Sequence, residues 1–142
     1  MKKILFLCTG NSCRSQIAEG LANDIFDSSF HIESAGTEKH GVNPYAIKTL
    51  ENIGIDISDY KSKTISLDEL NHFDLVITLC GDAKDKCPVL DKGVKHIHWD
   101  LRDPAKFKGT ELEIMSHFGN TRDLILNNIK ELKISLEKGN LK

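Results

Sequence analysis

The segment CTGNSCRS, which begins at Cys8, combines a cysteine, a small polar loop and an arginine at a spacing that suits a tetrahedral oxyanion. Gly10 and Asn11 tolerate positive φ angles, so backbone N–H groups can turn inward and form an anion nest. A helix beginning near Ser15 would add its positive dipole end, and the Arg14 guanidinium matches such an anion in bidentate fashion. The same field favours the thiolate of Cys8, which would then be a nucleophile at the floor of the site.

The loop as a whole supplies enough donors to surround an anion, and Ser15 can hydrogen-bond the thiolate and later stabilise it as a leaving group. A nucleotide-binding P-loop is excluded, because no G-x-x-x-x-G-K-[ST] occurs. The alternative is a tight strand-to-helix turn with an incidental buried cysteine, but the full string between a strand and a helix is more specific than that. The expected oxyanion-binding residues are Thr9, Gly10, Asn11, Ser12, Cys13 and Arg14.

The spacing of the cysteines bears on metal binding and redox chemistry. Zinc sites usually use C-x2-4-C pairs. The C-x4-C interval here just fits that range, but it encloses Gly10 and Asn11 and leads into a helix, and the second interval is C-x6-C, so we expect no bound metal. The chain has four cysteines, which are Cys8, Cys13, Cys80 and Cys87. An even number of cysteines would suggest structural disulfides in a secreted chain, and it suggests metal or redox chemistry in a cytosolic chain.

Hydrophobic periodicity predicts strands and helices in alternation. Continuous or alternating apolar runs predict four strands, over residues 3–8, 30–34, 73–80 and 94–99. Apolar residues spaced every three or four positions predict a helix from Ser15 to about Phe26 and a second that Pro44 opens and Gly54 stops.

Two capping boxes mark further helices. Ser66 with Glu69 predicts one short helix, and Thr110 with Glu113 predicts the start of the last helical region. We expect Gly119-Asn120 to bend or break that region early, and Gly139 to end it.

This alternation predicts an α/β, flavodoxin-like three-layer sandwich with a four-stranded parallel sheet in the order 2-1-3-4 and the anion loop after strand 1. Ligands of such sheets bind beyond the carboxyl ends of the strands, at the switch point. Cys8 ends the first expected strand and Cys80 the third, so two cysteines remote in sequence would face the same place. The length fits one domain over residues 1–142.

Composition and net charge give no support for two classes of partner, nucleic acids and membranes. The net charge is −2 and 28% of residues are charged, so nothing favours nucleic acid or a polybasic membrane contact. The first apolar run, Ile4 to Cys8, is too short for a secretion signal, and no stretch approaches the roughly 18 apolar residues of a membrane span. We therefore expect a cytoplasmic protein, with a monomer as the default.

Four segments, together with the overall length, extend these motifs over nearly the whole chain: CTGNSCRSQIAEG, SAGTEKHGVNPYAI, DLVITLCGDAKDKCPVL and HWDLRDP. Together they resemble the low-molecular-weight tyrosine phosphatase superfamily and, within it, the thioredoxin-coupled arsenate reductases. Phosphate and arsenate are near isosteres, so the loop alone does not separate the two activities.

Three features favour the reductase. A phosphatase needs neither Cys80 nor Cys87, whereas a reductase must supply two electrons. Phosphatases of the superfamily carry aromatic residues after the Asp-Pro pair, and this chain has Ala105 and Lys106 there. Gln16 stands where the phosphatases often have proline.

The resemblance implies a three-cysteine relay without a bound organic cofactor. Cys8 would attack arsenate while Asp103 protonates the departing oxygen. Cys80 would then attack the Cys8 sulfur, which releases arsenite and leaves a Cys8–Cys80 disulfide. Cys87 would attack Cys80, and reduced thioredoxin would reduce the Cys80–Cys87 disulfide. Phosphate and sulfate would compete as oxyanions.

Several assignments had alternatives. Asp103 is preferred over Asp100 as the acid because it precedes Pro104 and matches the family's Asp-Pro pair. Cys13 has no part in the relay and is interpreted as structural. His96 and His98 share one face of the last strand, where a metal pair is less favoured than two polar residues at a sheet edge.

Reductases of this family often hold potassium beside the loop, and the resemblance maps its oxygen ligands onto Asn11, Glu19 and Ser34. Lys61 and Lys63 stand at two of the remaining ligand positions, and ammonium groups are hostile to a cation. We therefore expect no potassium dependence, with Lys63 the better candidate to replace the ion and bond the oxygens of Asn11 and Glu19; solvent-facing lysines are the alternative.

Two other functions stay open at this point. A low-molecular-weight protein tyrosine phosphatase would hydrolyse phosphate monoesters through Cys8 without needing Cys80 and Cys87. A non-catalytic oxyanion-binding regulator of the same fold would bind anions with an unreactive Cys8. His40 and Asn43 match family positions near the mouth and receive no role.

Overall fold

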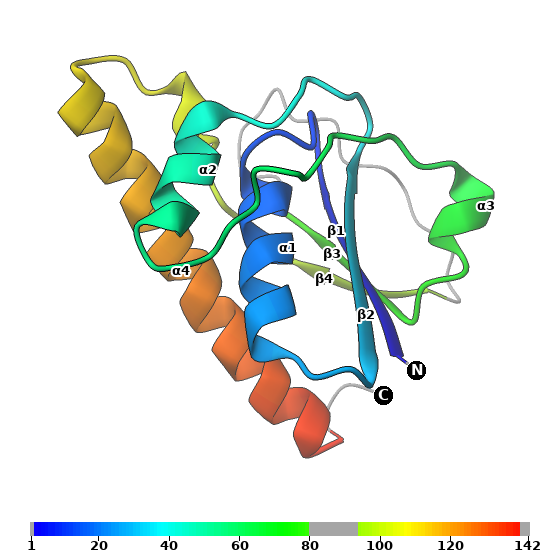
Figure 1. The fold of residues 1–142 in the computed structure, drawn as a ribbon. Coiled ribbons are helices and arrows are strands. Elements are labelled where there is room, and N and C mark those ends of the chain that lie inside the picture. Colours follow the sequence, from blue (N-terminus) through cyan, green and yellow to red (C-terminus); the bar gives the residue numbers. More distant parts are fainter. Residues whose placement is uncertain (1, 80–93, 140–142) are drawn as a thin grey trace.

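The computed structural model describes residues 2–79 and 94–139, and its centre is a four-stranded parallel sheet (Figure 1). The strand order is β2-β1-β3-β4, as expected for the flavodoxin-like class. Residues Ile4 to Cys8 are all buried, which confirms a first strand covered on both faces. The strands are β1 (Lys2–Cys8), β2 (Phe30–Gly36), β3 (Leu75–Thr78) and β4 (Lys95–His98).

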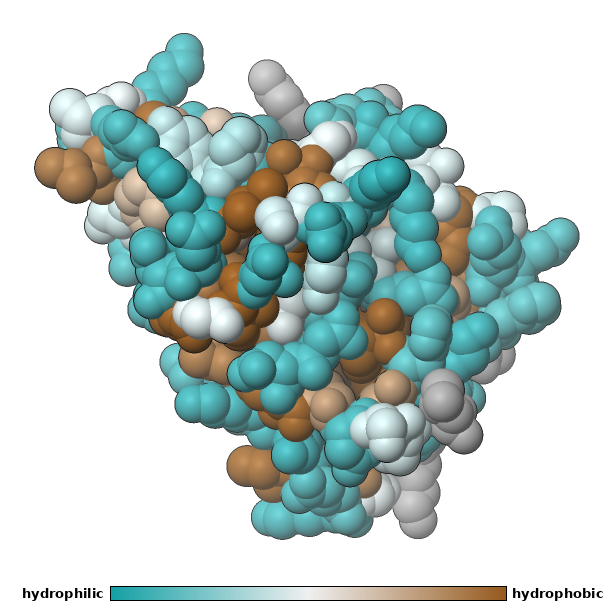
Figure 2. All heavy atoms as spheres, viewed as in Figure 1, coloured by the Kyte–Doolittle hydropathy of each residue, from teal (hydrophilic) through white to brown (hydrophobic). Residues whose placement is uncertain are grey.

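The long helices α1, α2 and α4 cover one face of the sheet, and the short α3 lies on the other side (Figure 1). Phe6 of β1 packs into the core with Leu21 and Phe118 from these helices, while Leu7 packs on the opposite face with Leu70. Hydrophilic side chains cover most of the surface in the same view, with smaller hydrophobic areas between them (Figure 2). The helices are α1 (Arg14–Ile25), α2 (Pro44–Glu51), α3 (Leu67–Leu70), the 3-10 turn η1 (Pro104–Lys106) and α4 (Glu111–Glu137).

Both predicted capping boxes are present. Ser66 and Glu69 exchange hydrogen bonds at the start of α3, and Thr110 and Glu113 do the same at the start of α4. Each box satisfies backbone N–H groups that a helix N-terminus leaves without intrahelical partners.

The predicted break at Gly119-Asn120 is wrong, because α4 runs without interruption over 27 residues. Phe118, Thr121 and Ile125 are buried on both sides of this pair, against the rest of the core. A glycine costs a helix only about 1 kcal/mol relative to alanine, and packing on this scale outweighs it. No helix among the described residues is both long enough and apolar enough to cross a membrane.

Candidate active site

The loop after β1 folds tightly around the side chain of Asn11. Asn11 is fully buried and has a φ of 47°, in the left-handed region expected for an anion nest. The first turn of α1 follows at once, with Arg14 as its first residue and Ser15 as its second. Cys8 is 2% exposed at the end of the strand, beneath this loop.

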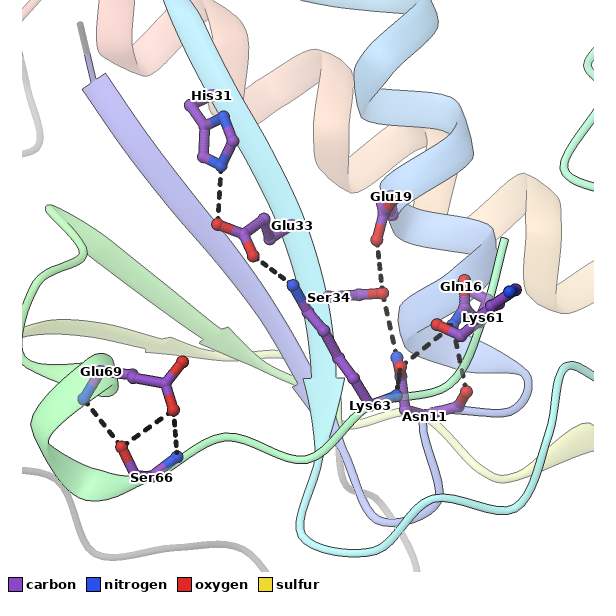
Figure 3. Close-up of polar contacts among 10 residues, drawn as sticks. All are labelled: Asn11, Gln16, Glu19, His31, Glu33, Ser34, Lys61, Lys63, Ser66 and Glu69. Atoms are coloured by element: carbon purple, nitrogen blue, oxygen red, sulfur yellow. Dashed lines mark hydrogen bonds and ion pairs between the residues drawn. The ribbon is translucent and has the colours of Figure 1, made fainter. Parts of the chain in front are cut away.

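A chain of hydrogen bonds runs from the nucleophile into the protein, and part of it is visible in Figure 3. The Asn11 amide nitrogen donates to Ser15 Oγ at 2.8 Å and to Ser34 Oγ at 2.9 Å. Ser34 then donates to Glu19 Oε1 at 2.6 Å. Because Ser15 Oγ already accepts from Asn11, its own hydrogen is available for Cys8 Sγ, which lies 2.9 Å away. The Ser15 hydroxyl can therefore donate to Cys8 Sγ, although either atom can act as the donor in this contact.

Burial raises the pKa of two titratable groups near the loop. Burial, with the Asp103 carboxylate adding to it, raises the pKa of the Cys13 thiol to about 12. Cys13 therefore stays protonated beside the loop and does not compete as a nucleophile, in agreement with its structural interpretation. Burial also raises the pKa of Glu19, against the opposing effects of Ser34 and Lys63.

Arg14 connects the anion loop to the segment that carries the acid. Its Nη1 donates to the Leu101 carbonyl at 2.9 Å, and its Nη2 lies 3.9 Å from Asp103 Oδ2. Asp103 caps η1, where its Oδ1 accepts from Ala105 N at 3.0 Å. The Asp103 carboxylate is thus held by the turn that it starts, with its second oxygen towards Arg14.

These groups surround one cavity of about 310 Å³. The cavity brings together Cys8, Arg14 and Asp103, whereas Asp100 lines a separate cavity. Cys80 and Cys87 lie outside the described residues. The residues that line the first cavity are Cys8, Thr9, Gly10, Ser12, Cys13, Arg14, His40, Asp103, Ala105 and Lys106.

His40 is the lining residue to which the sequence analysis gave no role. Residues 37–43 run beside the anion loop and bond to its backbone, with Glu38 N donating to Thr9 O at 2.8 Å and Asn43 N to Ser12 O at 3.0 Å. The sequence offered one signal for this role: Glu38 and His40 closely follow the second strand, which lies next to β1 in the sheet.

The position that the family resemblance assigns to potassium is already supplied with N–H donors here (Figure 3). Gln16 Nε2 donates to Asn11 Oδ1 at 3.0 Å, to the Asn11 carbonyl at 3.2 Å and to the Lys61 carbonyl at 3.2 Å. The Lys63 backbone N–H also donates to Asn11 Oδ1, at 2.8 Å. Oxygens that accept these hydrogens are poorly placed to ligate a cation, so the residues present do not fit potassium.

The expected role of Lys63 needs a correction. Its ammonium group bonds Glu33 rather than Asn11 or Glu19, and only its backbone reaches Asn11. Glu33 sits on β2 and also contacts His31, so a local acidic partner was available that the resemblance did not suggest. Lys61 contributes its carbonyl to Gln16.

His96 and His98 both lie beside Thr78. Both rings lie within hydrogen-bond distance of Thr78 Oγ1, at 2.8 and 2.7 Å, on the edge strand β4. Burial and the neighbouring His98 lower the pKa of His96, which favours a neutral ring. No group of three or more potential metal ligands occurs within residues 2–79 and 94–139.

Comparison with known proteins agrees with this geometry. Residues 3–141 match the family described as low molecular weight phosphotyrosine protein phosphatase. An arsenate reductase of Bacillus subtilis (strain 168) is 52% identical over 130 residues, which are 92% of this chain and 94% of the relative.

Two solved structures are also similar. One, described as an arsenate reductase in the phosphate binding state, has a TM-score of 0.72 at 34% identity and covers 93% of this chain and 96% of its own. A thioredoxin-dependent arsenate reductase of Corynebacterium glutamicum has a TM-score of 0.64 at 29% identity, over 92% of this chain and 62% of its own. The chain therefore belongs to the low molecular weight phosphotyrosine protein phosphatase family, and within that family it is similar to the arsenate reductases.

Proposed function

We propose that the protein reduces arsenate to arsenite with electrons from its own cysteines. The observation that carries this proposal is the cavity in which Cys8, Arg14 and Asp103 meet, in a chain about half identical to named arsenate reductases over most of its length. A site with these three groups binds a tetrahedral oxyanion, attacks its central atom and protonates a departing oxygen.

The first step uses groups that the structure describes. The Cys8 thiolate attacks arsenic and forms a sulfur–arsenic bond, while the hydroxyl group of hydrogen arsenate takes a proton from Asp103 and leaves as water. Arg14 and the loop N–H groups stabilise the charge on the remaining oxygens. Ser15 supports the thiolate before the attack through its contact at 2.9 Å.

The redox steps depend on Cys80 and Cys87, whose roles are those expected from the family. The Cys80 thiolate attacks the Cys8 sulfur, and the sulfur–arsenic bond breaks with its electron pair on arsenic. Arsenic is thereby reduced from As(V) to As(III), and a Cys8–Cys80 disulfide forms. Cys87 then attacks Cys80, which frees Cys8 as a thiolate and leaves a Cys80–Cys87 disulfide.

The electron donor that we propose is reduced thioredoxin, since one similar structure is described as thioredoxin-dependent. Phosphate is expected to compete for the cavity, because another is described in a phosphate binding state. We further propose a cytoplasmic monomer with one domain over residues 1–142, no bound organic cofactor, and no nucleic-acid or membrane partner.

The experiment follows NADPH oxidation in the presence of thioredoxin, thioredoxin reductase and arsenate. The intact protein should turn over, and Cys8→Ser and Cys87→Ser should each lose arsenate-dependent turnover. Ser29→Ala, in an exposed turn outside the cavity, is the control and should keep it.

The second candidate is a phosphatase, which the family match favours. It would hydrolyse an aryl phosphate through Cys8 at the same rate with or without Cys87, and it would consume no NADPH with arsenate. That pair of results would replace the reductase proposal.

A further inference from the structure

We propose that His40 is an oxyanion-binding residue of the cavity, and that Glu38 holds its imidazole ring in the binding state. The proposal deepens the proposed function, on which it rests for the identity of the anion. It assigns a binding contact that neither the loop motif nor the Asp-Pro pair supplies.

The backbone positions His40 firmly over the loop. His40 N donates to the Gly10 carbonyl at 3.0 Å, and Glu38 N donates to the Thr9 carbonyl at 2.8 Å, so the two segments keep a fixed register. The ring lies directly against Gly10: a Cβ built on Gly10 would be 2.4 Å from His40 Nδ1. Glycine at this position thus admits the ring, and the ring forms a wall of the cavity.

Glu38 distinguishes the two ring nitrogens of His40. Its Oε1 is 3.0 Å from Nε2, so the carboxylate accepts the Nε2 hydrogen and leaves Nδ1 on the side of Gly10. In neutral imidazole with a hydrogen on Nε2, Nδ1 is an acceptor and repels an oxyanion. In imidazolium both nitrogens donate, so protonated His40 can donate from Nδ1 to the anion while Glu38 stabilises its charge.

The net positive charge of the groups that line the cavity is smaller than the negative charge of the anion, so a further cation would be favourable. Arg14 and Lys106 are positive, the Cys8 thiolate is negative, and Asp103 is neutral when it acts as an acid. These groups sum to about one positive charge, to which the α1 N-terminus adds roughly half. Dianionic arsenate carries two negative charges, so a further cation improves the balance, and the Glu38 charge is screened because its side chain is 44% exposed.

The chain contains a matched control for this pair. His31 and Glu33 are also two residues apart, with Nε2 2.6 Å from Oε2, and the His31 side chain is 44% exposed against 54% for His40. His31 lies on β2 and is not among the residues that line the cavity. His31 therefore provides a histidine of similar exposure and spacing that does not line the cavity, with the further difference that its partner Glu33 also bonds Lys63.

The test measures binding of inorganic phosphate to the reduced, full-length protein by calorimetry, for the wild type, His40→Gln and His31→Gln. The ratio of dissociation constants at one pH removes the titration of phosphate itself. At about pH 6 we expect His40→Gln to weaken binding roughly five- to tenfold, and at about pH 8 by a smaller factor, because a contact that needs imidazolium weakens in more basic solution. His31→Gln should bind as the wild type at both pH values.

Glu38→Gln tests the pair. At about pH 6 it should weaken binding less than His40→Gln, and the double variant should bind no more weakly than His40→Gln alone.

Binding by His40→Gln within twofold of the wild type at both pH values would overturn the proposal, as would equal losses in His40→Gln and His31→Gln or additive losses in the double variant. Thermal unfolding checks that each variant folds. Phosphate binding needs no turnover, so NADPH oxidation by the wild type tests the proposed function separately.

Discussion

The Ser15 hydroxyl group connects the hydrogen bonds of Asn11 to the Cys8 sulfur. Ser15 Oγ accepts from the Asn11 amide and lies 2.9 Å from Cys8 Sγ. The conformation of the loop at Asn11 and the environment of the Cys8 sulfur are therefore linked by two hydrogen bonds through Ser15, in addition to the charge of the cavity.

Ser15→Ala should slow the reaction of Cys8 with little effect on folding. A hydrogen bond to a charged group contributes roughly 1.5–3 kcal/mol, so we expect about a 10- to 100-fold slower arsenate-dependent turnover. Alkylation of Cys8 by iodoacetamide near neutral pH should slow as well. Ser29→Ala, in an exposed turn, is the control and should react as the wild type; equal rates for both variants would show that Ser15 does not support the thiolate.

Replacing sodium by potassium at constant ionic strength should leave turnover unchanged. The physical reason is that Asn11 Oδ1 and the Lys61 carbonyl already accept hydrogens from Gln16, and the Lys63 ammonium lies at Glu33. The measurement is the initial rate over a series of potassium concentrations. Stimulation by more than about twofold would contradict the assignment of these oxygens to N–H donors.

At the scale of elements, β2 supports the loop through a close approach of two backbones. A Cβ on Gly36 would lie 2.5 Å from the Glu38 carbonyl oxygen and 2.7 Å from both Asn11 N and the Thr9 carbonyl oxygen. These neighbours are backbone atoms of the oxyanion loop and of the segment that carries His40, so none of them can swing aside as a side chain would.

Gly36→Ala should therefore damage both stability and binding. Overpacking of this kind costs typically 1–3 kcal/mol, and we expect urea unfolding to show a loss in that range together with weakened phosphate binding. Gly54→Ala is an informative contrast: the space around Gly54 is open, but its φ of 82° strains alanine, so it should lose stability without losing phosphate affinity. Unaltered phosphate binding by Gly36→Ala would contradict the close approach.

Thr110→Ala should destabilise the protein by about 1 kcal/mol, the usual cost of removing an N-cap. Thr110 starts the 27-residue α4, whose buried face completes the core against α1 and α2. The measurement is the urea midpoint, with Ser66→Ala in the box of α3 as a parallel case. A change below about 0.3 kcal/mol would show that α4 depends on packing alone.

Local sequence signals predicted β1, α1 and both capping boxes well, because each rests on residues close together in the chain. The continuity of α4 through Gly119-Asn120 was missed, since it depends on Phe118 and Ile125 meeting the core. The ion-pair partner of the Lys63 ammonium was missed for a similar reason. Glu33 lies 30 positions earlier in the chain and comes near Lys63 only when the sheet forms.

For the molecule as a whole, the Lys63–Glu33 ion pair joins the segment before α3 to the sheet and makes stability depend on pH. Burial acts to raise the pKa of Glu33, but hydrogen bonds from Lys63 and His31 outweigh it and hold that pKa below its ordinary value. The folded state thus binds fewer protons at Glu33 than the unfolded state in mildly acidic solution. The stabilisation is present above the ordinary glutamate pKa and is lost as pH falls through the lowered one.

Glu33→Gln should therefore lower the free energy of unfolding by roughly 0.5–1 kcal/mol near neutral pH, since the pair is partly exposed. The difference from the wild type should shrink as pH falls below about 4. Urea unfolding over a pH series measures it, and Glu137→Gln, whose pair with Lys133 is 3.9 Å apart and exposed, is the control. A difference that persists unchanged at low pH would exclude the ion pair as its cause.

The strand that ends in Cys8 lies between β2 and β3, whereas the segment that brings Asp103 follows the edge strand β4. An edge strand can separate from its single neighbour while the centre of the sheet stays paired. The amides of Ile4 to Leu7 should accordingly be among the slowest in the molecule to exchange with deuterated solvent, and those of Lys95 to His98 faster. Nucleophile and acid would then belong to units that open independently, so the acid can leave and return while the oxyanion loop remains intact.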